Sequence, residues 1–298
     1  MAPNAITSAL DIRPARGAEV AVARRMVPEV FKAAIAPDRV LLARAADDVQ
    51  PIGVAALAWR PWGTPAGFPI HVHVVERARR QGVGRALVRA AALLSRDDTD
   101  RFHAWDAVDE GGDGDAFARA AGFTPQRRTL HYQADLAACQ AIVQPIHERL
   151  QGYGAIPPDA AVVALREAPA HEVARLVSNA FGARYDAMVA SIGARGGFDA
   201  DLSFVLMHEG AVAAAILQRF VDGVPHVEVS VVAPALQCGW AVVVLLHEAA
   251  RRGLAAGGHR FGFRCEDGVR DTVNLARRVG ARLTRTAVEH SAALEALL

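Results

Sequence analysis

The chain has 298 residues, enough for about two domains that each bury a core of their own. Apolar residues make up 52% of it, which excludes a disordered chain. The formal net charge is +1, which gives no electrostatic basis for binding nucleic acid or an anionic membrane. Residues 1–10 lack the basic and long apolar segments of a signal peptide, and no apolar run reaches membrane-spanning length, so we expect a cytoplasmic protein without a membrane partner.

The first half of the chain alternates between strand-like and helix-like segments. Short apolar runs with alternation predict strands, and apolar residues at intervals of three and four predict helices. In chain order the segments are strand 10–14, helix 18–34, strands 39–44 and 52–59, a strand leading into 72–75, helix 84–95, strand 101–108, helix 115–121 and closing strand 127–134. This order predicts a mixed α/β domain.

A basic, glycine-containing turn joins one of these strands to the helix that follows. The stretch Val72–Arg89 reads VHVVERARRQGVGRALVR. A helix N-terminus offers unbonded N–H groups and a partial positive charge, and Gly82 and Gly84 let a ligand approach the backbone closely. Three basic residues lie in the same turn: Arg79, Arg80 and Arg85. The turn therefore predicts a pyrophosphate site, although it has neither the Gly-Lys-Ser/Thr of a P-loop nor the third glycine of a dinucleotide loop.

The segment Arg79–Gly84 resembles the Arg/Gln-x-x-Gly-x-Gly/Ala signature of the GNAT superfamily of N-acetyltransferases. Farther on, Phe117–Phe123 resembles the helix that precedes the family's final hairpin. The resemblance implies an enzyme that uses acetyl-CoA, with backbone amides of the strand before the turn holding the thioester carbonyl and the turn holding the pyrophosphate. The contacts that it implies are Val74, Val75, Arg79, Arg80, Gln81, Gly82, Val83, Gly84 and Arg85.

The first domain has no obvious general acid or base where the family often carries one. The corresponding positions on the strand hold Phe68 and Ile70, and the position of the family's frequent tyrosine acid holds Ala118. His71 and His73 are nearby candidates for the base. Strand alternation turns both toward the other face of the sheet unless a bulge changes the parity, and either could equally be a structural histidine.

A glycine- and proline-rich stretch, Gly152–Asp159, is the strongest linker signal in the chain. Beyond it the order of strands and helices repeats and ends in strand 282–289. We therefore expect an N-terminal GNAT domain at 1–136, a linker at 137–159 and a C-terminal GNAT-like domain at 160–298, both α/β with a mixed sheet. In layout the chain resembles tandem GNAT proteins such as mycothiol synthases.

The second domain shows the opposite pattern of residues. Counting back from Pro234 places Glu228 and His226 where the family carries a base, and both share one face of a strand. Its loop, Pro234–Ala241, has one residue and one glycine fewer than the first loop and no arginine. We expect this half to be degenerate and to shape an acceptor cleft, with Glu228 and His226 as alternative catalytic residues.

These observations predict an N-acetyltransferase that transfers the acetyl group of acetyl-CoA to a primary amine of an unidentified small molecule, as a monomer or homodimer. Two alternatives stay open: catalysis by the second domain, and a non-catalytic acyl-CoA sensor or scaffold. No metal is expected, because the three cysteines are widely separated and show no metal-ligand spacing. Four aromatic residues are candidates for the acceptor side of the first domain, although core or hairpin packing is the favoured role of each: Trp59, Trp62, Trp105 and Tyr132.

Overall fold

The structure, a computed structural model, describes residues 10–28, 30–32, 39–46, 48–57, 67–181, 189, 197–237 and 239–298. The contacts divide the chain into two compact units. Unit 1 comprises residues 1–128 together with 287–298, and unit 2 comprises residues 129–286. Each unit is a mixed α/β fold, as the sequence predicts. Among the described residues, no helix is both long enough and apolar enough to cross a bilayer.

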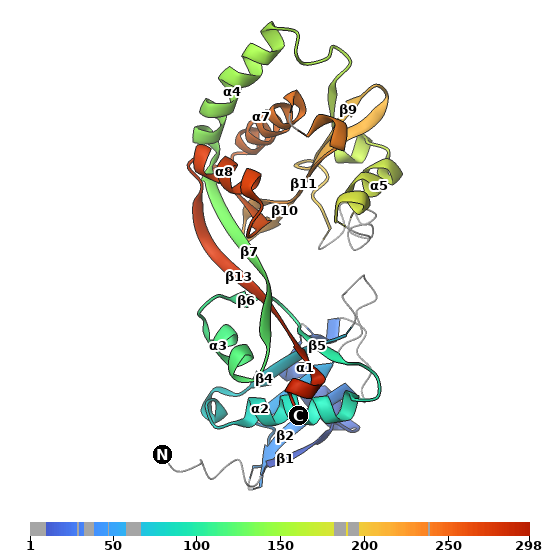
Figure 1. The fold of residues 1–298 in the computed structure, drawn as a ribbon, viewed down its shortest axis with the longest axis vertical. Helices are drawn as coiled ribbons and strands as arrows, with labels where there is room; N and C mark the ends of the chain where they lie inside the picture. The colour runs from blue at the N-terminus through green and yellow to red at the C-terminus, as the bar shows by residue number, and fades with distance from the viewer. Residues whose placement is uncertain are drawn as a thin grey trace. The chain divides into compact units, whose positions relative to one another are not determined.

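The sheet of unit 1 has the order β1-β2-β3-β4-β5-β13 (Figure 1). β6 pairs with an earlier part of β13, residues 287 and 288. Strands β1 to β4 are antiparallel, whereas β4 and β5 are parallel. β2 and β3 are almost wholly apolar and buried, as befits central strands that are covered on both faces. The strands are β1 Leu10–Pro14, β2 Val40–Ala45, β3 Gly53–Leu57, β4 Phe68–Val74, β5 Arg101–Ala104, β6 Val108–Asp109 and β13 Arg282–Ala293.

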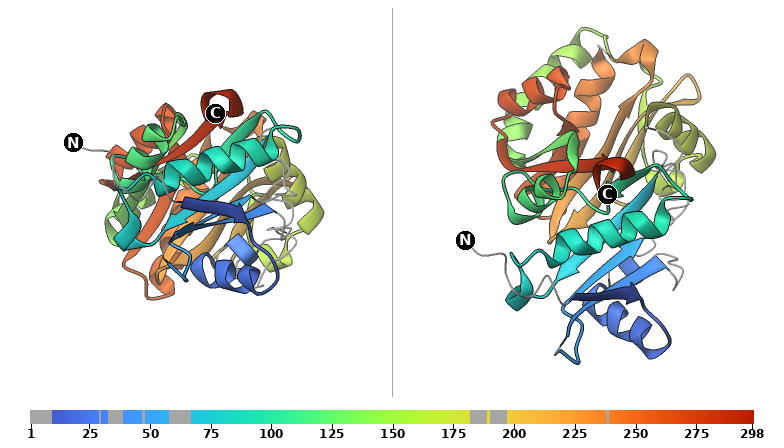
Figure 2. Two further views of the ribbon diagram at one scale, coloured as in Figure 1. Left: turned by 90° about the horizontal axis from the view of Figure 1, so that it is seen from below. Right: turned by 60° about the horizontal axis from the view of Figure 1, so that its bottom comes forward.

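Helices cover both faces of this sheet, with α1 and α2 on opposite sides (Figure 2). The helices are α1 Ala18–Met26, α2 Val83–Ser95 and α3 Asp113–Ala120, and the short 3₁₀ turns are η2 Val30–Lys32, η4 Glu76–Ala78 and η8 Leu294–Ala296. α2 buries Val83, Leu87 and Ala91 at helical spacing against the strands and against Phe102. α1 packs its Ala23 on the other face of the sheet, against Val54.

Unit 2 repeats this plan with the order β8-β9-β10-β11-β12-β7, in which only β11 and β12 are parallel. Its strands are β7 Thr124–Asp135, β8 Ala161–Ala164, β9 Phe204–His208, β10 Ala211–Val221, β11 Val224–Val232 and β12 Arg260–Glu266. Its helices are α4 Leu136–Gly152, α5 Ala170–Phe181, α7 Trp240–Ala255 and α8 Arg270–Arg278, with 3₁₀ turns η5 Leu165–Glu167 and η7 Pro234–Leu236. α5 and α7 pack into separate apolar clusters.

Each unit is closed by the strand that was expected to close the other unit. In unit 1, β5 pairs with β13, the last strand of the chain, through residues 291–293. In unit 2, β12 pairs with β7, through residues 129–135. The prediction that strand 127–134 closes the first domain and strand 282–289 closes the second is therefore wrong. Because both strands alternate in the same way, their periodicity could not indicate which sheet each would join.

The exchange also moves the units away from the expected boundaries. Residues 287–298 belong to unit 1, although they lie at the end of the chain. Most of the segment 137–159 that was expected to be a linker lies in α4, which packs against α7 inside unit 2 and buries Leu136, Cys139 and Val143.

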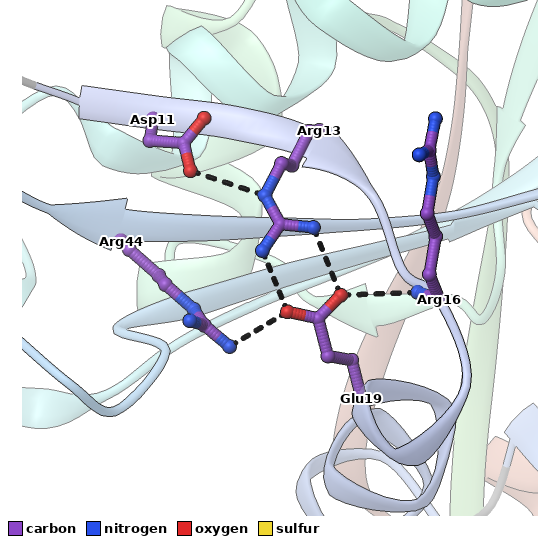
Figure 3. Close-up of polar contacts among 5 residues, drawn as sticks. All are labelled: Asp11, Arg13, Arg16, Glu19 and Arg44. Atoms are coloured by element: carbon purple, nitrogen blue, oxygen red, sulfur yellow. Dashed lines mark hydrogen bonds and ion pairs between the residues drawn. The ribbon is translucent and has the colours of Figure 1, made fainter.

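A charged network fixes the start of α1 to the edge of the unit 1 sheet (Figure 3). The guanidinium of Arg13 donates to both carboxylate oxygens of Glu19, at 3.0 and 2.7 Å, and Arg44 donates at 2.9 Å. The backbone N–H of Arg16 donates to Glu19 at 3.0 Å, and Asp11 accepts from Arg13 at 3.2 Å. The hydrogen bonds from Arg13 and from the N–H of Arg16 hold the pKa of Glu19 below its usual value.

Replacing Glu19 with glutamine should lower the thermal stability of the protein at pH 7 by a small amount, because the network is largely exposed. A lowered pKa in the folded state stabilises the fold above the unfolded-state pKa of about 4.3, and this contribution disappears as the pH falls through the folded-state value. The difference in Tm between wild type and variant should thus shrink as the pH is lowered below 5. Asp11→Asn, which removes one exposed contact, is the control; a difference that does not change with pH would contradict the account.

Candidate functional site

The ladder between the parallel strands β4 and β5 ends at the last residue of β5, before β4 ends. Their ladder stops where Ile70 lies opposite Ala104, whereas β4 continues to Val74. The C=O of Ile70 accepts from the N–H of Trp105, which follows β5. Backbone groups alternate along a strand, so Val72 and Val74 turn their N–H and C=O to this same side. The last part of β4 therefore presents backbone groups where the β4–β5 ladder has ended.

The loop after β4 and the start of α2 form a second wall of the site. α2 begins at Val83, directly after Gly82, whose φ of 82° lies in the left-handed region. Arg80 has a φ of 62°, which side-chain-bearing residues rarely adopt. The N–H of Ala86 bonds back to the C=O of Gly82, so the N–H groups before Ala86 have no partner within the helix. The first turn carries no acidic residue that would cancel the partial positive charge.

A cavity of about 570 Å³ lies between β4, this loop, the start of α2 and α3. Six of the nine residues that the sequence predicts as acetyl-CoA contacts line it: Val74, Arg79, Arg80, Gly82, Gly84 and Arg85. The structure thus brings most of the predicted contacts into one groove. Asp113 and Phe117 of α3 line its far wall, and the sequence reasoning did not assign either of them to the site.

The arginines give this groove its charge. Arg79 donates from Nε to the C=O of Val74 at 3.1 Å, which places its guanidinium beside the exposed edge of β4. Arg80 pairs across the groove with Asp113, with 2.5 Å between Nη2 and Oδ1. Both partners are largely exposed, so this ion pair contributes only ~0–1 kcal/mol and an anionic ligand could displace Asp113 at little cost. Arg85 is exposed in the first turn of α2.

Three predicted contacts lie outside the cavity. The prediction that the amide of Val75 faces a ligand is wrong, because its N–H already donates to the C=O of Ile52 at 3.0 Å. Gln81 donates from Nε2 to the C=O of Arg77 and so braces the loop. Val83 buries its side chain in the core under α2, which leaves only its backbone for a ligand.

The candidate bases His71 and His73 keep the ordinary parity of a strand. β4 pairs with β3 from Ile70 to Val74 without a register shift, so the bulge that could have changed the parity is not present there. The side chains of Val72 and Val74 pack in the core under α2. His71 and His73 therefore lie on the opposite face, the face that α1 covers. His73 also borders the groove.

Gly84 has a packing role that the motif does not reveal. A Cβ at this position would lie 2.6 Å from Cε2 of Phe117, closer than real Cβ atoms come, and 3.0 Å from its Cζ, tighter than most real contacts. The second glycine of the signature thus lets α2 approach α3 as well as a ligand. Gly82, at the exposed N-cap, is the glycine that the left-handed loop conformation requires.

The last strand of the chain fixes α3, the far wall of the groove. His290 on β13 is buried, and its Nε2 lies 2.8 Å from Oδ1 of Asp115. The N–H of Gly111 and the Nε of Arg119 also donate to this carboxylate, at 2.9 and 2.8 Å. The Gly111 N–H, with Arg119 and His290, holds the pKa of Asp115 low, so Nε2 of His290 carries the donated proton. No local signal could have identified a partner 175 positions away.

In unit 2, Glu228 lies at the bulge that β4 lacks. Leu217 lies opposite Val229 and Gln218 lies opposite Val227, so Glu228 is the extra residue of β11. Arg219 donates from Nε to Glu228 at 3.0 Å, and Arg264 lies 2.5 Å away. His226 also lies close, with its Nδ1 3.3 Å from the carboxylate, but this contact lacks hydrogen-bond geometry.

The electrostatics of this cluster make Glu228 a poor base. Burial would raise its pKa, but the contacts with His226, Arg264 and Arg219 outweigh burial and lower the pKa to about 2. A general base works best with a pKa near the operating pH. Burial, with Arg285 and Arg264, lowers the pKa of neighbouring His131 to about 4. The cluster therefore holds a permanently ionised carboxylate between arginines rather than a proton acceptor.

The loop of unit 2 differs from that of unit 1 in its backbone. Four residues, 79–82, separate η4 from α2, but only three, 237–239, separate η7 from α7. Gly239 has a φ of −128° where Gly82 is left-handed. Trp240 opens α7 and packs edge-on against His208, with 5.4 Å between ring centroids. This loop has no arginine and a bulky side chain at its helix start.

Two of the candidate acceptor aromatics can be placed. Tyr132 stacks on Phe263 in the core of unit 2, at 5.3 Å between ring centroids, which agrees with the core packing that the sequence favours over the acceptor side. Trp105 packs against the apolar cluster under α1. Trp59 and Trp62 lie outside the described residues. Within the ranges that the structure describes, no three His, Cys, Asp or Glu side chains gather as metal ligands do.

Comparison with known proteins finds a matching family model and solved structures with a similar fold. Residues 11–123 match the sequence model of the acetyltransferase (GNAT) family. A GCN5-related N-acetyltransferase from Sphaerobacter thermophilus aligns over 96% of both chains, with a TM-score of 0.62 and 14% identity. A tandem GNAT protein from the clavulanic acid biosynthesis pathway aligns over 96% of this chain and 98% of its own, with a TM-score of 0.60 and 17% identity. A search of curated protein sequences finds no match.

The contact between Gly84 and Phe117 can be tested by a double-mutant cycle. Gly84→Ala should cost about 1–3 kcal/mol of unfolding free energy, because the new methyl group must push Phe117 aside. In a Phe117→Ala background the same change should cost much less, since the clashing ring is gone. Denaturant unfolding of the four proteins measures both costs. Equal costs in the two backgrounds would show that Gly84 is required for another reason.

Proposed function

We propose that this chain, whose residues 11–123 match the sequence model of the acetyltransferase (GNAT) family, transfers the acetyl group of acetyl-CoA to a primary amine of a small molecule, with acetyl-CoA bound by unit 1. One observation carries this proposal. A single groove combines the start of α2, a left-handed glycine, three arginines and the exposed edge of β4. The N–H groups of the helix start and the arginines can bind a pyrophosphate. The backbone groups of the strand edge can form hydrogen bonds with the amide-rich arm of CoA and with its thioester.

The groove orients the proposed ligand. With the pyrophosphate at the N–H groups of residues 83–85, the thioester end extends along β4 toward Val72 and Val74. A backbone N–H of this edge can donate to the thioester oxygen, where negative charge develops during the reaction. Such a donor is held by the β3–β4 ladder and needs no rearrangement when the charge forms.

The chemistry requires one proton transfer. The amine nitrogen attacks the carbonyl carbon, the new C–N bond forms, the C–S bond breaks and CoA leaves as a thiolate. The attacking nitrogen must lose a proton, which the proposal assigns to His73, directly or through water. His73 lies between Val72 and Val74 in sequence, on the face of the sheet opposite α2. An amine that approaches from that face would meet both the thioester and the imidazole.

We propose that unit 2 is not a second acetyl-CoA site. Its loop is shorter, has no arginine and starts its helix with Trp240. Catalysis by Glu228 and His226 is the weaker alternative, because a carboxylate with a pKa of about 2 accepts protons poorly at neutral pH. A non-catalytic acyl-CoA sensor would share the groove but release no CoA from acetyl-CoA with any amine, so an amine panel separates the two.

Arg85 provides a test of the groove with a matched control on the same helix. Arg85 and Arg89 are both exposed on α2, one turn apart, but only Arg85 lines the cavity. Arg85→Glu should weaken acetyl-CoA binding at least tenfold, since it sets a carboxylate against the phosphates. Arg89→Glu should change the Kd less than threefold. Isothermal titration calorimetry measures both, and equal losses would mean that only long-range charge matters.

His73 should affect turnover more than binding. Once an amine panel yields a substrate, His73→Ala should lower kcat by about 10²-fold while the Kd of acetyl-CoA stays near the wild-type value. His71→Ala, two residues away on the same face, is the control and should keep most of the activity. Wild-type turnover in His73→Ala would remove this residue from the mechanism.

A further inference from the structure

A second cavity, of about 480 Å³, lies within unit 2, and the proposed acetyl transfer does not use it. Its walls come from β10, β11, β12, α4, α7 and α8. Most of the lining is apolar, with Phe261, Phe263 and Leu246 as its larger side chains. A volume of this size falls within the ~300–1,000 Å³ typical of small-molecule sites.

The start of α7, the counterpart of the helix start that lines the groove of unit 1, does not line this cavity. The part of α7 that lines the cavity, Leu246 to Gly253, is the C-terminal half of the helix. The N-terminal loop of α7, where an acyl-CoA pyrophosphate would be expected, contributes no described residue to the cavity.

Residues of both charges meet at the polar end of the cavity, where Glu228, Arg264 and Glu266 line the wall. Glu228 is ionised and only 3% exposed, and it is bonded to Arg219 and to Arg264. A ligand amine would have to displace an arginine from this carboxylate, and a ligand carboxylate would have to displace Glu228. Both exchanges would break an ion pair of a carboxylate that is itself buried, which is unfavourable. The arrangement favours a ligand without net charge.

The rim of the cavity is unusually apolar for a surface. Phe181 and Val269 both line it and both are 44% exposed. Cys139 and Cys265 also line it, but burial raises the pKa of each thiol, that of Cys139 to about 11, so neither is a ready nucleophile. The cavity therefore offers binding surface rather than covalent chemistry.

From these observations we propose that the unit 2 cavity binds an uncharged, largely apolar small molecule. The apolar walls would bury the body of the ligand, and the Glu228–Arg264 pair would close the polar end without requiring a charge on the ligand. The proposal is independent of acetyl-CoA binding by unit 1, because all its residues lie in unit 2.

The test uses the full chain and the neutral fluorescent probe N-phenyl-1-naphthylamine. Wild type should bind the probe saturably, at one site per chain. Ala249→Phe, which projects a ring into the cavity from α7, should weaken binding at least tenfold. Ala255→Phe, exposed near the end of the same helix and outside the cavity, is the matched control and should change binding less than twofold.

Thr272→Trp on α8 fills the cavity from another wall and decides the result if Ala249→Phe fails to fold by circular dichroism. Acetyl-CoA should not displace the probe. Absence of saturable binding, unchanged binding in a folded cavity-filling variant, or displacement by acetyl-CoA in the Arg85→Glu protein would each overturn the proposal. The last result would show that the cavity takes acyl-CoA itself.

Discussion

The early end of β5 is the constraint on which the site of unit 1 depends. The ladder between the two parallel strands stops where Ile70 lies opposite Ala104, the last residue of β5, while β4 runs on to Val74. The same strand leads directly into η4 and the loop that starts α2. One segment therefore joins an exposed strand edge to a helix N-terminus, and a ligand with a phosphate group and an amide-rich arm can use both. The arginines add affinity to a geometry that the backbone already provides.

This geometry also depends on residues from the far end of the chain. β13 completes the sheet of unit 1 next to β5, and its His290 bonds to Asp115 on α3, which forms the far wall of the groove. α3 also packs closely against α2, because the ring of Phe117 occupies the space that a side chain at residue 84 would need. The wall of the groove is thus held from both sides, by a buried hydrogen bond and by close packing.

Part of this could be predicted from the sequence, namely the features written in local patterns. The strand, glycine turn and helix around Arg79–Gly84 are contiguous, so periodicity and turn chemistry located the groove. Three features are not local. The exchange of β7 and β13 depends on which partner each strand meets, the use of the Val75 amide by Ile52 depends on pairing, and the bulge at Glu228 changes parity without a sequence marker. The pKa of Glu228 likewise depends on Arg264, which is distant in sequence. Counting along the sequence suggests Glu228 as a base, whereas in the structure Glu228 is ion-paired with Arg219 and Arg264.

The central claim is that unit 1 alone holds acetyl-CoA. Calorimetric titration of the intact protein with acetyl-CoA tests it most directly, because the stoichiometry is obtained before any acceptor is known. The account predicts one site per chain, with a single binding isotherm. Two sites per chain would contradict it by showing that the short, arginine-free loop of unit 2 also binds the cofactor, and no binding would show that the groove of unit 1 is a structural remnant.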